Sequence, residues 1–187
     1  MQILAAPFLS AIAGDYESIA TVTVGAGGQA TISYSSIPQT YKHLQIRGIG
    51  RSANAVTADQ TKMQMNGDTS TSNYAFHALI GNGSTVSSAG YGSGIVAGIT
   101  PVIRFTGANA TANVFGVTVF DILDYSLTTK YKTVRVLHGY DLSGSGEVQL
   151  ASGVWLSTSA VTSLDISIQT SGNFAQYTSF ALYGIKG

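Results

Sequence analysis

The chain has 187 residues, with nine basic and nine acidic side chains, so its formal net charge at pH 7 is zero. Charged residues make up only 10% of the sequence, against about 25% in an average soluble domain. This balance argues against the basic surface that draws a protein to nucleic acid or to an anionic membrane, and neither partner is expected. The sequence has no cysteine, which excludes disulfides and thiolate metal sites. A surface so poor in charge favours contact with neighbouring subunits in an assembly over an inert secreted protein.

Residues 1–14, MQILAAPFLSAIAG, are apolar and contain no basic side chain. Leu4, Phe8 and Ile12 share one helical face, and Pro7 would bend or shorten any helix there. We expect an N-terminal arm that packs on its own domain or on a neighbouring subunit. The alternative is a cleaved secretory signal, although such signals normally begin with a basic residue. No apolar run reaches the roughly 18 residues of a membrane span.

From residue 15 onward the dominant hydrophobic period is two, which is typical of β-strands. Strands are expected within 16–24, 28–37, 41–51, 61–65, 73–80, 94–105, 112–125, 130–141, 147–157, 163–170 and 174–185. Turns rich in Gly, Ser, Thr and Asn separate these stretches, and no repeat, linker or charge block divides the chain. The pattern predicts one all-β domain over residues 15–187, a jelly-roll-like antiparallel β-sandwich that follows the short arm.

Three strands carry predictions about which side chains point into the core. In 41–51, Leu44, Ile46 and Ile49 are expected to point inward. The segment 112–125 is apolar and β-branched throughout, which predicts a buried strand. In the last strand, Phe180 and Leu182 lie on one face, and both are expected in the core.

Few side chains are arranged for chemistry. His43, His77 and His138 lie on separate predicted strands, without a second ligand at the spacing of a metal site, and are expected to face solvent or a subunit boundary. Asp121 and Asp124 are three residues apart and would point to opposite faces of a strand, which does not suit acid–base catalysis. No catalytic residue, cofactor or metal is therefore predicted, and the chain is not expected to be an enzyme.

The turn between 61–65 and 73–80 contains Asn66, Asp68 and Asn73, which could offer oxygen atoms to calcium. The number of carboxylates is too low for a convincing calcium site. Side-chain hydrogen bonds to the turn backbone are the favoured interpretation.

Four tyrosines, Tyr74, Tyr91, Tyr140 and Tyr177, lie in or beside predicted turns. Exposed aromatic rings of this kind form sugar-binding platforms on β-sandwiches. Tyrosine is equally favoured at protein–protein interfaces, where the ring and the hydroxyl suit half-wet surroundings. Both uses remain open for these four residues.

Several stretches resemble a family of small virion proteins and C-terminal fibre domains of tailed bacteriophages, especially those of marine bacteria. They are DYESIATVTVGAGG, SSIPQTYKHLQIRGIGR, MNGDTSTSNYAFHALIGNGS, DILDYSLTTKYKTVRVLHGY, GVWLSTSAVTSLDI and SGNFAQYTSFALYGIKG. They follow one another across most of residues 15–187, and the resemblance carries no catalytic residue.

The resemblance implies a non-enzymatic structural protein of the virion, assembled in the host cytoplasm. The most specific expectation is a decoration or cement protein on the outer capsid surface. Its partners would be other virion proteins, either the major capsid protein or tail proteins, together with further copies of itself in a homo-oligomer. One alternative is a tail or tail-fibre component that binds a host surface glycan. A second alternative is a carbohydrate-binding module of non-phage origin.

Overall fold

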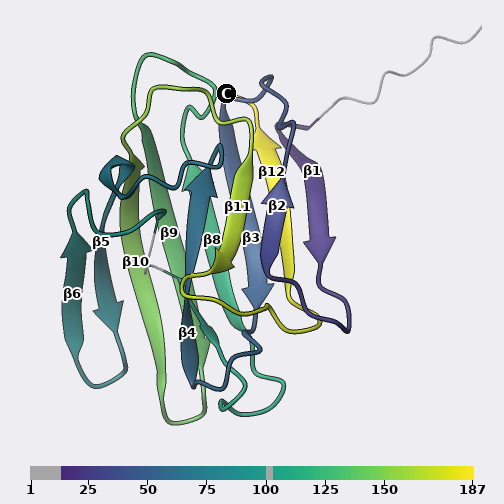
Figure 1. The fold of residues 1–187 in the computed structure, drawn as a ribbon, viewed down its shortest axis with the longest axis vertical. Coiled ribbons are helices and arrows are strands. Elements are labelled where there is room, and N and C mark those ends of the chain that lie inside the picture. Colours follow the sequence, from purple (N-terminus) through teal and green to yellow (C-terminus); the bar gives the residue numbers. More distant parts are fainter. Residues whose placement is uncertain (1–13, 100–102) are drawn as a thin grey trace, which may run out of the picture.

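The computed structural model describes residues 14–99 and 103–187. Leu4, Phe8 and Ile12, the predicted contact residues of the arm, lie outside the described residues. The described chain forms two antiparallel sheets packed face to face (Figure 1). This arrangement confirms the predicted all-β, jelly-roll-like sandwich. Among the described residues, no helix is long and apolar enough to cross a membrane.

Among the residues that the structure describes, one sheet has eight strands and the other has four. In spatial order, the large sheet consists of β1 (Tyr16–Thr23), β12 (Ser179–Ile185), β3 (His43–Gly50), β8 (Gly116–Ile122), β9 (Lys132–Asp141), β10 (Gly146–Trp155), β5 (Tyr74–Gly81) and β6 (Val86–Tyr91). The small sheet consists of β2 (Thr31–Tyr34), β11 (Leu164–Ile168), β4 (Ala58–Met65) and β7 (Arg104–Thr106). A 3₁₀ turn, η1 (Thr71–Asn73), leads into β5.

The closing strand β12 lies between β1 and β3, and not at a sheet edge. Its alternation points Phe180 and Leu182 into the sandwich, where both side chains are fully buried. The prediction for these two residues is confirmed. Because β12 pairs on both sides, the last strand in the sequence connects the first strand to the centre of the large sheet.

Strand β3 corrects one prediction of orientation. Leu44 and Ile46 point inward as expected, but Ile49 is 45% exposed on the outer face, and Gly48 takes the inward position. The Phe180 ring fills the space that a side chain at Gly48 would need, since a Cβ added there would lie 2.4 Å from Phe180 Cε1. The strand therefore keeps strict alternation, and its glycine faces the core.

An aromatic cluster joins the two sheets. Phe105 of β7, Phe174 and Phe180 pack edge to face, with ring centroids 5.7–6.3 Å apart. The Phe105 ring lies over Gly50 and Gly116, which are paired across β3 and β8. Side chains at these glycines would meet the ring at about 3 Å, so their absence provides the room that the ring occupies.

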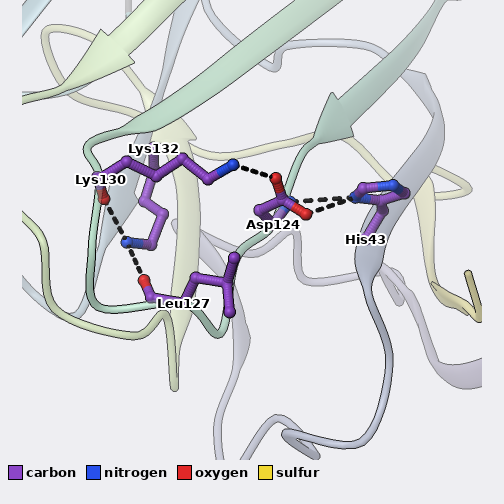
Figure 2. A network of polar contacts seen from close by, with 5 residues as sticks. All are labelled: His43, Asp124, Leu127, Lys130 and Lys132. Atoms are coloured by element: carbon purple, nitrogen blue, oxygen red, sulfur yellow. Dashed lines mark hydrogen bonds and ion pairs between the residues drawn. The ribbon is translucent and has the colours of Figure 1, made fainter.

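Buried polar contacts fix the connection between β8 and β9 (Figure 2). Lys132 is fully buried, and its Nζ donates to the carbonyl oxygens of Leu127, Lys130 and Thr158 at 2.6, 3.0 and 3.1 Å. Burial and the nearby charge of Lys130 lower the pKa of Lys132. Because three carbonyls satisfy its ammonium group, the buried lysine holds the loop without leaving an unpaired donor.

Asp124 anchors the other end of the same loop. Its carboxylate accepts a hydrogen bond from Lys130 Nζ at 2.5 Å, and its backbone N–H donates to His43 Nδ1 at 3.0 Å. The hydrogen bond from Lys130 holds the pKa of Asp124 below its usual value. Asp121 lies on β8 and bonds Arg135 instead. Asp121 thus lies on a strand and Asp124 in a turn, and each carboxylate bonds a different cation.

Phe180→Ala should lower the free energy of unfolding by about 3–5 kcal/mol, because it removes a buried ring and leaves a cavity beside Phe105 and Phe174. Urea unfolding followed by circular dichroism measures this change. The control is Ala181→Ser on the outer face of the same strand, which should stay within about 0.5 kcal/mol of wild type. Equal unfolding midpoints for Phe180→Ala and wild type would contradict the core position of this ring.

Candidate protein-interaction face

The outer face of the small sheet has the character expected of a solvated surface. Polar side chains occupy neighbouring strands in register, with Ser33, Asp165 and Gln64 in one row. Ser33 Oγ donates a hydrogen bond to Asp165 Oδ1 at 2.6 Å. Hydrophobic residues of these strands point the other way, into the core. This half of the molecule follows the usual rule of apolar residues inside and polar residues outside.

The outer face of the large sheet breaks this rule. Strand register places aliphatic side chains in two adjacent rows that run across the sheet from β3 to β6. The first row consists of Ile49, Val117, Gly139, Val148, Gly81 and Val86. The second row consists of Arg47, Val119, Leu137, Leu150, Leu79 and Ser88. The eight aliphatic residues of these two rows are called the aliphatic patch below.

Most of the aliphatic patch is open to solvent in the described chain. Seven of its members are 45–75% exposed, and Val119 is half-buried. Single exposed hydrophobic residues are normal on protein surfaces, whereas a contiguous patch on a soluble protein marks an interaction site. The strand over 112–125 was predicted to be buried, and this is wrong for its outer face, where Val117 is 55% exposed.

A polar row borders the aliphatic patch. Gln45, Asp121, Arg135, Ser152 and His77 follow one another across five strands. Asp121 accepts hydrogen bonds from Gln45 Nε2 at 2.7 Å and from Arg135 Nη2 at 2.6 Å. The acidic and basic members of this row therefore neutralise each other beside the patch.

Two stacked tyrosines continue this border toward β1. The rings of Tyr16 and Tyr183 lie 4.8 Å apart, and the Arg47 guanidinium lies over both, 5.3 and 5.8 Å from their centroids. Tyr16 also donates a hydrogen bond to Gln45 at 2.6 Å. The aromatic pair thus stabilises the position of the one charged residue within the second row.

Small residues hollow the outer face on both sides of β9. A hollow of about 600 Å³ lies over β9, β10, β5 and β6, where Ser152, Ser88 and Gly90 leave space between Leu79, Leu150, His77 and Arg135. A second hollow of about 380 Å³ lies over β12, β3 and β8, beside Ala181 and Ser179. The face therefore has protruding aliphatic side chains with shallow depressions between them. Side chains of another protein can fit into these depressions.

The four tyrosines that were predicted as candidate contact residues do not form one platform. Tyr74 is fully buried, where its hydroxyl accepts from Met65 N–H at 3.1 Å and donates to the Asp68 carbonyl at 3.0 Å. Burial raises the pKa of Tyr74 to about 12. The prediction that Tyr74 is a surface contact residue is therefore wrong. Tyr74 is the first residue of β5, and its side chain points into the core.

The other three tyrosines lie apart from one another. Tyr91 is partly exposed at the end of the edge strand β6, where it packs edge to face on Phe76. Tyr140 is half-buried near the end of β9, and its side chain points inward. Tyr177 is 69% exposed in the turn before β12. Strands β6 and β12 lie near opposite edges of the large sheet, so Tyr91 and Tyr177 cannot contact one ligand together.

The turn at Asp68 behaves as predicted. The Asp68 carboxylate accepts hydrogen bonds from the Ser70 N–H at 2.8 Å, from Asn73 Nδ2 at 2.7 Å and from Trp155 Nε1 at 2.7 Å. Burial acts to raise the pKa of Asp68, but these hydrogen bonds outweigh it and the pKa is lowered. Within residues 14–99 and 103–187, no three His, Asp or Glu side chains gather as a metal site would require.

The three histidines differ in their surroundings. His77 is exposed on the outer face and His43 is half-buried, but His138 is buried inside the sandwich, contrary to prediction. His138 Nε2 accepts a hydrogen bond from the Arg104 N–H at 3.2 Å. Arg104 in turn pairs with Glu147 at 2.9 Å. Burial and the Arg104 charge lower the pKa of His138 to about 4.

Comparison with known proteins adds little to this geometry. No family model matches the chain, and no curated protein matches it. The crystal structure of Caenorhabditis elegans galectin LEC-6 is similar with a TM-score of 0.34 and 7% sequence identity, over 89% of this chain and 96% of that one. A likeness at this level supports no inference about function.

The aliphatic patch was missed by reasoning from the sequence, although a signal was present. Strands β8, β9 and β10 carry apolar residues in both registers. The segment 112–125, which contains β8, was interpreted as a buried strand for this reason. Only the structure shows that the small sheet covers one face and leaves the other open.

The free energy of unfolding should fall as the pH is lowered from 8 to 5, because His138 stays neutral in the folded chain but binds a proton near pH 6.5 when unfolded. Between those pH values the loss from this residue should be about 2 kcal/mol. Urea unfolding of wild type and His138→Gln at both pH values measures it. A variant with the same pH dependence as wild type would contradict this role of His138.

Proposed function

We propose that this chain is a non-enzymatic structural protein of a tailed-bacteriophage virion, and specifically a decoration protein of the outer capsid surface. The observation that carries this proposal is the aliphatic patch, which gives the domain a surface for binding protein. The virion as the setting, and the capsid as the place within it, come from the sequence resemblance described above. The charge balance of the chain agrees with a role in assembly.

The patch favours a contact that works within an assembly of many copies. Completing the burial of a half-exposed Val or Leu contributes about 1 kcal/mol, so the eight side chains together contribute about 8 kcal/mol. Association of two free proteins costs about 4–15 kcal/mol in lost translational and rotational freedom. The patch alone therefore supports only modest affinity, and further contacts in a particle would strengthen the attachment by raising the effective concentration.

The contact made by the aliphatic patch itself should be insensitive to salt. Asp121 and Arg135 beside the patch pair with each other, and no block of like charge lies in the two aliphatic rows. Burial of such a surface removes few charged groups from water, so the desolvation penalty is small. This property suits permanent packing in a particle better than the electrostatic steering of a transient partner.

The second candidate is a glycan-binding component of the tail. The hollow of about 600 Å³ supports it, because Arg135, His77, Ser88 and Ser152 offer polar groups around a partly apolar floor. Sugars present hydroxyl groups along with apolar ring faces, and both could be accommodated there. The two candidates differ in the number of copies that each virion would contain.

Purified virions should contain this protein at a copy number on the order of hundreds, because a decoration protein occupies the many symmetry-related sites of a capsid. Quantitative gel densitometry against the major capsid protein measures the ratio. Virions without the protein would overturn the proposal. A few copies to a few dozen, together with binding to host glycans that Arg135→Ala abolishes, would establish the tail candidate instead.

A further inference from the structure

We propose that a second copy of this chain covers the aliphatic patch. The two large sheets would pack face to face about a twofold axis that runs across the strands, between the two aliphatic rows. Strand β9 of one copy would then lie antiparallel over β9 of the other. This inference rests on the proposed role of the patch as an assembly surface, and it identifies the partner.

Strand β9 has an outward-facing sequence that complements itself in this arrangement. Its outward residues are Thr133, Arg135, Leu137, Gly139 and Asp141, and the last four are distributed evenly about His138, which points inward. Reversing the strand about position 138 places Leu137 opposite Gly139 and Arg135 opposite Asp141. A large side chain then meets an empty position, and a positive charge meets a negative one.

The neighbouring strands follow the same relation, because each aliphatic row continues across the sheet. On β5, Leu79 of the second row would lie opposite Gly81 of the first row. On β10, Leu150 would meet Val148, and on β8, Val119 would meet Val117. Aliphatic residues thus face either another aliphatic residue or a glycine over β8, β9, β10 and β5.

The charges at the border permit the same arrangement. Arg135 bonds Asp121 through Nε and Nη2, and its side chain is 70% exposed. Its remaining guanidinium nitrogen, Nη1, can therefore reach across to a carboxylate of a partner. Asp141 lies exposed at the end of β9, where it accepts a hydrogen bond from the Ser143 N–H at 2.7 Å. A neutral chain also adds no net repulsion between copies.

The face is large enough for a stable dimer. Six strands at about 4.8 Å spacing, and three outward rows at about 6.8 Å spacing, give an area of about 600 Å² per copy. This reaches the lower end of the standard range, in which each partner contributes roughly 600–1,000 Å². Two sheets packed about 10 Å apart are also a common arrangement in β proteins.

The test compares the oligomeric state of the full chain with that of Leu137→Arg, by sedimentation equilibrium. Wild type should be dimeric, and Leu137→Arg should be monomeric because it places a charge opposite Gly139. Thr133→Arg is the matched control, since it adds the same charge on the same face of β9 but outside the aliphatic rows, and it should remain dimeric. Circular dichroism and the melting temperature confirm folding; Leu150→Lys replaces Leu137→Arg if that variant does not fold.

A charge swap tests the register. Asp141→Arg should weaken the dimer at least tenfold, because it would place two arginines opposite each other. The double variant Arg135→Asp with Asp141→Arg should recover about tenfold in affinity relative to Asp141→Arg alone. An absence of recovery would overturn the proposed antiparallel register of β9.

Other outcomes separate this inference from the proposed function. A monomeric wild-type chain that is nevertheless abundant in virions would show that another virion protein covers the patch, which overturns the inference and leaves the function standing. If the dimer persists in Leu137→Arg but dissociates when residues 1–13 are deleted, the contact belongs to the arm and the inference is overturned. If the wild-type chain dimerises and the variants behave as expected, but purified virions do not contain the protein, the inference is supported and the proposed function is overturned.

Discussion

The packing of Phe180 against Gly48 is the contact on which the two-sheet arrangement depends. The ring occupies the volume that a side chain at Gly48 would take, and it joins Phe105 and Phe174 in a cluster between the sheets. Phe174 also forms β-bridges with Gln29 and Ser52, so the cluster reaches the loops at one end of the sandwich. A glycine inside a strand loses conformational entropy on folding, and here the packing of an aromatic ring offsets that cost.

Two cationic side chains, one half-buried and one fully buried, hold the long connections in place. Arg51 donates to the carbonyl oxygens of Ala110, Thr111 and Val114 at 2.7–3.0 Å, which secures the chain between β7 and β8. Lys132 does the same for the connection between β8 and β9. In these two connections, hydrogen bonds from one cation to several carbonyls satisfy backbone groups that have no partner in a sheet.

The aliphatic patch and the polar outer face of the small sheet give the molecule two different surfaces. Such a domain can lie with one surface against a protein and the other toward solvent. The same open sheet would be a hazard for a free monomer, because exposed aliphatic rows promote association. The glycines at positions 81 and 139 lie in the first row beside the aliphatic patch, where they leave space for side chains of another surface.

The sequence by itself determined the all-β class, most of the strands and the burial of Phe180 and Leu182, because alternation with a period of two is a local property of the chain. Strand β6 (Val86–Tyr91) lies outside every strand that was expected from the sequence. Only the tertiary structure decided that Ile49 points outward, that Tyr74 and His138 are buried, and that β8, β9 and β10 expose one aliphatic face. Ile49 pairs with Val117, and Val148 pairs with Gly81, so the first row joins residues 67–68 positions apart in the sequence. Which of two apolar faces meets the second sheet depends on strand order and on neighbouring side chains such as Phe180, and local periodicity contains neither.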